Sequence, residues 1–269
     1  MKDYFGKNAD ALKTKKLFLF DMDGTVYLEN TLFDGVKDLL YNILSAGGTY
    51  VFITNNSSKS VNDYVQKMQK LGVAATCDNF FTSTQAAVLL LKEKIGDGLI
   101  YAQGTQSFIQ ELRGGGLFVT ENYDENAQAI LVGFDSELTA EKMRATSKML
   151  TRCDVPYYAT NPDWVCPVDF GYVPDCGSMC FGYEKATGKK PQFIGKPEPL
   201  MIECAMRKFG VTREQTVVLG DRLYTDIASG INAGVDTVCV LSGEATLKDI
   251  EESDIKPAYV LAGAWEIDI

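Results

Sequence analysis

Asp21 and Asp23 are the residues of this chain whose types and spacing first suggest chemistry. They follow the apolar run Leu17–Phe20, which has the length and flanks of a buried parallel strand, and Gly24 behind them favours a turn. Alternate residues of an extended segment point to the same side, so both carboxylates can face the space beyond the strand. Paired carboxylates are costly there unless a cation balances them. Taken alone, the pattern fits a cation site and an ordinary Asp-Gly turn equally well.

Two later strand ends carry polar residues of the same kind. The runs Tyr50–Ile53 and Thr216–Leu219 have the composition of short buried strands. The polar residues that follow them are Thr54, Asn55 and Asn56 after the first run, and Asp221 and Asp226 after the second. Lys196 opens a helical segment that lies between the two runs in the chain. Ligands of an open parallel sheet bind just outside the carboxyl ends of its strands, so we expect these groups to converge.

The expected convergence predicts phosphoryl transfer. Several carboxylates in one crevice call for a hard cation, and oxygen ligands without histidine favour Mg²⁺ over zinc. Lys196 would supply a positive charge, and so would the start of the helix that Ser57 or Ser58 is expected to cap. Catalysis of phosphoryl transfer depends mainly on such positioning and charge neutralisation.

Histidine is absent from all 269 residues. Its absence excludes Ser-His-Asp and Cys-His nucleophiles and histidine-ligated zinc. The seven cysteines are odd in number, and the close pair Cys176 and Cys180 lacks a second pair to complete a zinc site, so we expect reduced thiols. Nucleophilic and acid–base work must therefore fall to Asp, Glu, Lys, Tyr, Cys or Ser.

The chain is acidic, with a net charge of −10 and a pI of about 4.7. Without a dense Lys/Arg run, this charge argues against a nucleic acid polymer as partner and leaves a small phosphorylated molecule. The first sixteen residues lack the apolar stretch of a signal peptide, and no run approaches eighteen apolar residues. We expect a cytoplasmic protein without membrane contact.

Strand-like and helical segments alternate along most of the chain. Helical spacing covers residues 34–46, 61–71, 84–94, 139–150 and 198–209. The alternation predicts an α/β fold with a doubly wound parallel sheet. The segment Pro156–Ser178 is rich in proline, glycine and asparagine and is expected to be irregular. Tight hinges near Thr84 and Gly188 would separate two domains.

The polar clusters also resemble a known family. They are similar to the four ordered motifs of the haloacid dehalogenase (HAD) superfamily, and the long insertion between the second and third motifs resembles its larger, C2-type cap. The motifs here are Asp21-x-Asp23-Gly24-Thr25, Thr54-Asn55-Asn56-Ser57, Gly195-Lys196-Pro197 and Gly220-Asp221-Arg222-x-x-Thr225-Asp226. Two further stretches resemble the NagD subgroup, whose members are Mg²⁺-dependent phosphatases; they are Ala159-Thr160-Asn161-Pro162-Asp163 and Gly182-x-Glu184-Lys185-x-x-Gly188.

The resemblance implies roles for the catalytic groups. Asp21 would be the nucleophile that forms a phosphoaspartyl intermediate, and Asp23 would serve as general acid and then as base. Mg²⁺ would be held by the Asp21 carboxylate, the backbone carbonyl of Asp23 and Asp221. Lys196 would add a second positive charge. Asp226 would orient Lys196, bind a metal water, or merely cap a helix.

The resemblance also implies groups that hold the substrate. Thr54 and the amides of Asn55 and Asn56 would bind the phosphoryl oxygens, together with Lys196. The segment that carries Asn161, Asp163 and Trp164 fits a specificity loop and a surface turn equally well; these three residues are retained as candidate contacts to the leaving group.

These observations predict a Rossmann-like HAD core with an inserted α/β cap. The core would comprise residues 1–83 and 188–269, and the cap, residues 84–187, would close over the crevice and offer a surface for a homodimer. The predicted activity is Mg²⁺-dependent hydrolysis of small phosphomonoesters, such as nucleoside monophosphates or sugar phosphates. The alternatives are a phosphotransferase or mutase on the same core, and a non-catalytic phosphate-binding protein.

Overall fold

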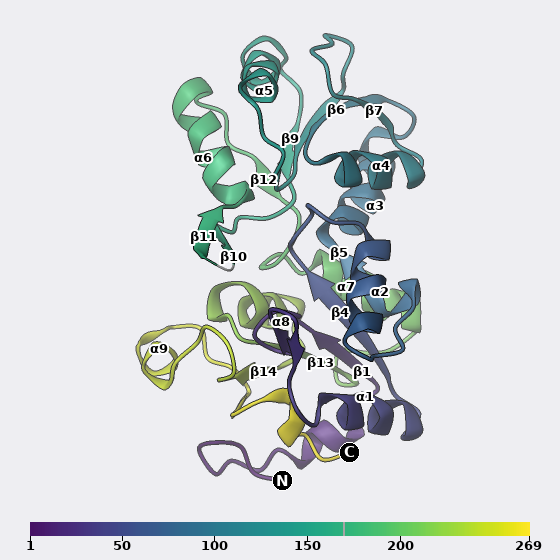
Figure 1. Cartoon of the computed structure of the whole chain (residues 1–269), viewed down its shortest axis with the longest axis vertical. Helices are drawn as coiled ribbons and strands as arrows, with labels where there is room; N and C mark the ends of the chain where they lie inside the picture. The colour runs from purple at the N-terminus through teal and green to yellow at the C-terminus, as the bar shows by residue number, and fades with distance from the viewer. Residues whose placement is uncertain (169) are drawn as a thin grey trace. The chain divides into compact units, whose positions relative to one another are not determined.

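The computed structural model describes residues 1–168 and 170–269 of the chain (Figure 1). It divides into two compact units. The core unit comprises Met1–Thr54, Val65–Phe81 and Lys196–Ile269, and the inserted unit comprises Asn55–Tyr64 and Thr82–Gly195. Both ends of the chain, purple and yellow in Figure 1, therefore belong to the core unit.

The core unit is built on a six-stranded sheet with the strand order β15-β14-β13-β1-β4-β5. Its strands are β1 (Leu17–Phe20), β4 (Thr49–Thr54), β5 (Phe80–Thr82), β13 (Thr216–Gly220), β14 (Asp236–Val240) and β15 (Tyr259–Leu261). All of β1 is buried, as the apolar run predicts for a strand covered on both faces. β1 runs parallel to both neighbours, with Leu17 beside Thr216 of β13 and Thr49 of β4. The carboxyl ends of these three strands therefore lie at one edge of the sheet.

Short helices connect the strands of the core unit. They are α1 (Val36–Ser45), α7 (Leu200–Phe209), α8 (Ala228–Ala233) and α9 (Leu247–Glu252), with the single turns η1 (Asp10–Thr14), η2 (Cys77–Asn79), η3 (Leu223–Ile227) and η4 (Ala264–Glu266). The helix α2 (Val61–Lys70) begins in the inserted unit and belongs to the core unit from Val65 onward. The hairpin β2 (Tyr27–Leu28) and β3 (Thr31–Leu32) follows β1 closely. α1 buries Val36, Leu39, Leu40 and Ile43, the apolar positions with helical spacing.

The inserted unit has a five-stranded sheet of its own, with the order β12-β9-β8-β6-β7. Its strands are β6 (Leu99–Gln103), β7 (Phe118–Thr120), β8 (Ala129–Val132), β9 (Tyr157–Ala159) and β12 (Gln192–Phe193). Every neighbouring pair in this sheet is parallel. Both units are thus α/β with parallel sheets, as the alternation of strands and helices predicted.

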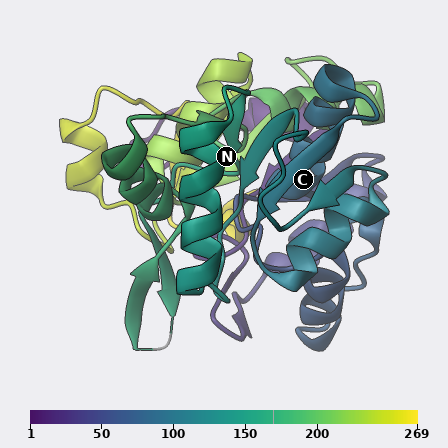
Figure 2. The same ribbon diagram turned by 90° about the horizontal axis from the view of Figure 1, so that it is seen from above.

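Four helices and a hairpin complete the inserted unit. They are α3 (Ser83–Ile95), α4 (Gln106–Gly114), α5 (Ala140–Arg152), α6 (Cys176–Thr187) and the hairpin β10 (Val165–Val168) with β11 (Gly171–Pro174). α6 packs against α5, and Figure 2 shows the two green strands of the hairpin at its lower left. Thr82, Thr105 and Thr139 cap the first three of these helices by accepting a bond from a backbone amide of the first turn.

Two local predictions were wrong. The segment Pro156–Ser178 is not irregular, because it contains β9, the β10–β11 hairpin and the start of α6. The N-cap of α2 is Ser60 rather than Ser57 or Ser58. The Asp63 amide donates to the Ser60 hydroxyl, and the Ser60 amide donates to the Asp63 carboxylate, which together form a capping box.

The contacts group some residues differently from the predicted domain limits. Residues 188–195 belong to the inserted unit because β12 pairs with β9, and residues 55–64 belong to it as well. The predicted limits of the core (residues 1–83 and 188–269) and of the cap (residues 84–187) stay a prediction. No helix in the described part of the chain is both long and apolar enough to cross a membrane.

Candidate active site

Lys196 links two carboxylates in the interior of the core unit. Its Nζ donates to Asp21 Oδ1 at 2.5 Å and to Asp226 Oδ1 at 2.6 Å, and it also reaches the carbonyl of Ile53 at 3.3 Å. The Lys196 side chain is 3% exposed and Asp226 is 1% exposed, so these bonds are shielded from water. Asp21, at 16% exposure, keeps limited access to solvent. The lysine thus holds the predicted nucleophile directly after β1.

Asp226 is fixed from both sides. Its Oδ1 accepts from Lys196 and its Oδ2 accepts from the backbone amide of Arg222 at 3.1 Å. It belongs to the π-helical turn η3, and Gly220 leaves room for it, since a Cβ there would lie 2.2 Å from the Asp226 Cβ. The contacts place Asp226 against Lys196, and its role stays a prediction.

Asp221 lies in a cradle of two glycines. A Cβ on Gly24, whose φ is +79°, would lie 2.4 Å from Asp221 Oδ2, and a Cβ on Gly243 would lie 2.0 Å from the same oxygen. Oδ2 accepts from the Glu244 amide at 2.7 Å. Oδ1 is buried and has no hydrogen-bond partner among the described residues. A buried carboxylate oxygen of this kind requires a partner, and a cation would provide one.

The three carboxylates of Asp21, Asp221 and Asp226 form one cluster. Ligand oxygens of all three lie within 4.8 Å of one another. Oxygen donors without nitrogen or sulfur suit Mg²⁺, and three acids outnumber the one lysine among them. The residues present therefore fit a divalent cation.

The ionisation of the cluster reflects this excess of negative charge. Burial raises the pKa of Asp21 well above its usual value, and the charge of Asp226 adds to the effect while Lys196 opposes it. Burial and the charge of Asp226 raise the pKa of Asp221 to about 7. Burial lowers the pKa of Lys196, but the charges of Asp21 and Asp226 outweigh it and raise the pKa above its usual value. Lys196 therefore stays positively charged, but its single charge does not balance the negative charges of all three carboxylates.

Asp23 differs from these three acids. Its side chain is 54% exposed. Its Oδ2 accepts from the Tyr27 hydroxyl at 3.2 Å, and its Oδ1 lies 3.9 Å from Lys67 Nζ. The carboxylate is outside the buried cluster, as suits a group that exchanges protons rather than one that holds a metal through its side chain.

Asn55, Asn56, Ser57 and Ser58 directly follow β4. Asn56 Oδ1 accepts from the amide and the hydroxyl of Ser58. α2 begins at Val61, whose amide donates to Glu111 at 3.1 Å, and the Ser60 amide donates to Asp63. The anion site expected at the start of this helix stays a prediction. Phosphate binding by Thr54 and by the amides of Asn55 and Asn56 remains a prediction.

Asn161 and Asp163 are buried and bonded to Asn55. Asn161 Nδ2 donates to the carbonyl of Asn55 at 2.7 Å, and Asn55 Nδ2 donates to Asp163 Oδ2 at 2.9 Å. They therefore do not form a surface turn. Trp164, which is 56% exposed, does lie at the surface and packs edge-on against Phe181. A role of these residues in specificity stays a prediction.

Sequence reasoning missed Tyr27, Lys67 and Gly243. Tyr27 and Lys67 reach Asp23 from a hairpin and from α2, and Gly243 approaches Asp221 from the loop after β14. Only the spacing of Tyr27 close behind Asp23 offered a signal. Arg222 pairs with Glu244 at 2.8 Å.

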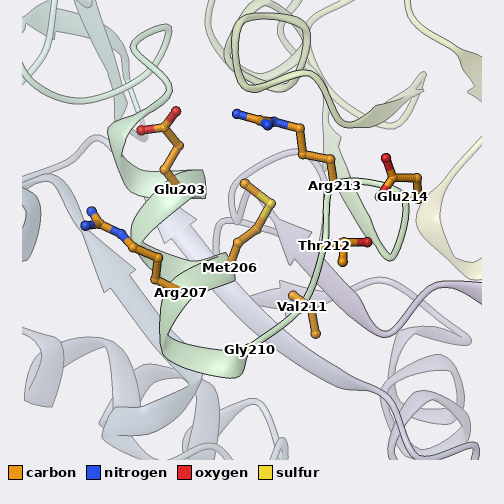
Figure 3. A pocket seen from close by; sticks show the side chains of 8 residues that line it. All are labelled: Glu203, Met206, Arg207, Gly210, Val211, Thr212, Arg213 and Glu214. Atoms are coloured by element: carbon orange, nitrogen blue, oxygen red, sulfur yellow. The ribbon is translucent and has the colours of Figure 1, made fainter.

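The core unit also has a surface hollow, which lies away from the acid cluster (Figure 3). Its volume is about 650 Å³, and its lining residues are Glu203, Met206, Arg207, Gly210, Val211, Thr212, Arg213 and Glu214. Residues 210–214 precede β13, whereas Asp221 follows that strand. The hollow therefore lies at the opposite end of β13 from the acid cluster and contains none of the predicted site residues.

Comparison with known proteins assigns the family. Residues 18–118 match the family model described as haloacid dehalogenase-like hydrolase, and residues 193–267 match one described as HAD-hydrolase-like. An acid sugar phosphatase from Staphylococcus aureus is 31% identical over 248 residues, which cover 92% of this chain and 95% of the relative. The chain belongs to the haloacid dehalogenase family of hydrolases.

Solved structures agree and indicate the NagD-like subgroup. A 4-nitrophenylphosphatase from Thermotoga maritima is 37% identical with a TM-score of 0.89, covering 94% of this chain and 96% of the other. NagD from E. coli K-12 is 32% identical with a TM-score of 0.86, covering 95% and 99%. A glycerol phosphate phosphatase from Mycobacterium tuberculosis, solved with magnesium, is 26% identical with a TM-score of 0.86, covering 93% and 75%.

Proposed function

We propose that this chain hydrolyses small phosphomonoesters with the help of Mg²⁺, through a phosphoaspartyl intermediate on Asp21. It is a phosphoric monoester hydrolase of its family, as the phosphatase relatives indicate. The observation that carries the proposal is the buried contact of Lys196 with Asp21 and Asp226, beside the unpartnered oxygen of Asp221. A lysine and an acid cluster at the carboxyl ends of parallel strands suit a phosphate and its metal.

We assign the metal to the carboxylates of Asp21 and Asp221 and to the backbone carbonyl of Asp23. A bound divalent cation would screen the repulsion between the Asp21 carboxylate and the phosphate and polarise the phosphoryl oxygens. The oxygen-only donors support Mg²⁺, and a neighbouring phosphatase was solved in complex with magnesium. Asp226 would not be a direct ligand, because both its oxygens already accept bonds from Lys196 and Arg222.

The chemistry proceeds in two steps on this chain's own residues. An Asp21 carboxylate oxygen attacks phosphorus, and the bond from phosphorus to the leaving oxygen breaks while Asp23 gives that oxygen a proton. Asp23, now a carboxylate, takes a proton from a water molecule that attacks the same phosphorus. The bond between phosphorus and Asp21 then breaks, which releases inorganic phosphate and restores both acids. The exposure of Asp23 suits this exchange of protons with substrate and water.

The phosphoryl oxygens would be held by Lys196, by Thr54 and by the amides of Asn55 and Asn56. Asn161 and Asp163 would support this function indirectly, since their bonds fix Asn55. Fixed donors are the form in which hydrogen bonds stabilise a charged transition state. The relatives act on sugar phosphates, 4-nitrophenyl phosphate and glycerol phosphate by their names, so we propose a small polar phosphomonoester as substrate.

The single experiment that tests this function is Asp21→Asn. The variant keeps the size of the side chain but removes the nucleophilic carboxylate, so phosphate release from 4-nitrophenyl phosphate with Mg²⁺ should fall by on the order of 10³-fold or more. Asp254→Asn, at an exposed aspartate of the core unit, is the matched control and should retain full activity. Activity of Asp21→Asn near the wild-type level would show that the nucleophile is wrongly assigned.

A panel of phosphorylated metabolites would identify the substrate class. Sugar phosphates, glycerol phosphate and nucleoside monophosphates are assayed for inorganic phosphate with Mg²⁺ and again with EDTA. Phosphate release without a second phosphorylated product supports hydrolysis. Transfer of the phosphoryl group to a sugar would instead establish the phosphotransferase alternative, and binding without turnover would establish the non-catalytic one.

A further inference from the structure

Tyr27 and Lys67, which lie outside the four motifs, form a small cluster with Asp23 in the core unit. The Tyr27 hydroxyl donates to Asp23 Oδ2 at 3.2 Å. Lys67 Nζ lies 3.7 Å from the centre of the Tyr27 ring and 3.9 Å from Asp23 Oδ1. One oxygen of Asp23 thus faces a hydroxyl donor, and the other faces a cation.

Tyr27 is held firmly in this position. Its side chain is fully buried, at 0% exposure. Its backbone carbonyl accepts from the Gly24 amide at 2.8 Å, and its chain pairs with Asp23 in an isolated β-bridge. The same short turn that carries the catalytic acid therefore also fixes the phenol that contacts it.

The Asp23 side chain, unlike that of Tyr27, is exposed to solvent. A short side chain that is 54% exposed can rotate unless a partner fixes it. A general acid must place one oxygen within hydrogen-bond reach of the leaving oxygen, so a carboxyl that rotates freely is in the productive position for only part of the time.

We propose that Tyr27 and Lys67 are positioning residues for the proton transfer by Asp23. Tyr27 holds Oδ2, which leaves Oδ1 to carry the proton to the leaving oxygen. Lys67 stabilises the carboxylate that Asp23 becomes after it has given that proton away, and its charge over the ring strengthens the phenol as a donor. This inference rests on the proposed function, in which Asp23 is the general acid.

The test uses leaving groups that differ in their need for a proton. A series of substituted phenyl phosphates of similar size is compared by kcat/KM, which reports formation of the aspartyl phosphate. 4-Nitrophenolate leaves readily without a proton, whereas the anions of phenol and 4-methoxyphenol do not. In Tyr27→Phe, kcat/KM for the poor leaving groups should fall by about 10- to 100-fold, and for 4-nitrophenyl phosphate by less than about 3-fold.

Lys67 is tested in the same series. Lys67→Met keeps the length of the side chain without its charge. In this variant, kcat/KM should fall more for the poor leaving groups than for 4-nitrophenyl phosphate. Lys67→Arg keeps a cation over the ring and should restore most of the loss.

The core unit offers a matched control for both residues. Lys7 lies 4.8 Å from the ring centre of the buried Tyr259, which belongs to β15 and is far from Asp23 in the sequence. Tyr259→Phe and Lys7→Met remove the same chemical groups from a similar pair. Both variants should leave the dependence on the leaving group unchanged.

A double variant separates positioning from a merely structural role. Asp23→Asn alone removes the proton donor, so adding Tyr27→Phe to it should cause no further loss for phenyl phosphate. An equal loss by Tyr27→Phe across all leaving groups, or a full additional loss in the Asp23→Asn background, would overturn the proposal. The proposed function itself would fail differently, because Asp21→Asn would then retain activity on every substrate.

Discussion

Asp21 shares one buried lysine with Asp226, while Asp221 beside them forms no ion pair within 4.0 Å among the described residues. A cluster with more acids than bases is unfavourable in the folded protein, because burial removes the water that would screen the like charges. Under the proposed function, the same excess of negative charge would attract a divalent cation. The site would then exchange stability of the metal-free protein for affinity toward metal.

The cost of this arrangement can be measured at Asp221. Asp221→Asn should stabilise the metal-free protein at neutral and alkaline pH while it abolishes activity. Folding raises the pKa of Asp221 from 3.8 to about 7, so the folded state holds this proton more tightly than the unfolded chain does. As pH rises between these two values, the wild-type protein therefore loses stability, whereas asparagine has no proton to lose.

Thermal melts in EDTA across a pH series check this prediction. The melting temperature of Asp221→Asn should exceed that of the wild type by little near pH 4 and by a few degrees near pH 8, as roughly expected for a loss of this kind. Equal melting temperatures at all pH values would show that the carboxylate ionises at no cost in the folded protein.

The loops that follow β1 and β14 meet around Asp221, and their glycines make that approach possible. Gly243 is the clearer case, since its φ is not in the left-handed region and alanine would meet no backbone strain. A Cβ there would still lie 2.0 Å from Asp221 Oδ2 and force that carboxylate to move.

Gly243→Ala should therefore lower activity strongly without unfolding the protein. We expect on the order of a 10²-fold fall in kcat/KM, because a small displacement of a positioning group has such effects on catalysis. Activity and circular dichroism are measured together. Gly182→Ala, in α6 where a Cβ meets nothing within 4 Å, is the control and should behave as wild type. Full activity of Gly243→Ala would contradict the role of this loop.

Elements differ in how well the sequence predicted them. β1, β4 and β13 were predicted because a strand covered on both faces is apolar along its whole length. α6 was missed because Gly177 and Gly182 lower its helix propensity, and its stability comes from packing Tyr183 and the cysteines into the core of the inserted unit. Tertiary packing of this kind leaves no periodic signal.

The candidate site likewise has contacts that the sequence predicted and contacts that it did not predict. Asp21, Asp221, Asp226 and Lys196 were predicted to converge because parallel strands present their carboxyl ends at one edge, and their contacts confirm it. The contact of Lys67 with Asp23 and of Gly243 with Asp221 could not be predicted, because each depends on how a distant helix or loop packs.

For the whole molecule, Mg²⁺ should act as a stabilising ligand. A cation that binds only the folded acid cluster raises stability by about 2.7 kcal/mol at a hundredfold excess over its dissociation constant. Calorimetry with Mg²⁺, and again after EDTA, should show a higher melting temperature that reverses on chelation. Asp221→Asn should show little of this shift. A shift of equal size in the variant would place the metal elsewhere.

The position of β13 beside β1 has a consequence for the synthesis of the protein. Asp21 is made early, most of the inserted unit (residues 82–195) is then made in one stretch, and Lys196 and Asp221 come only afterwards. Domains generally fold as units while the chain is made, so we expect the inserted unit to fold on the ribosome before β1 gains both its neighbours. Phosphate release by chains stalled after residue 195, compared with completed ones, would check this order. The nucleophile of a nascent chain would then stay inactive until translation has passed residue 221.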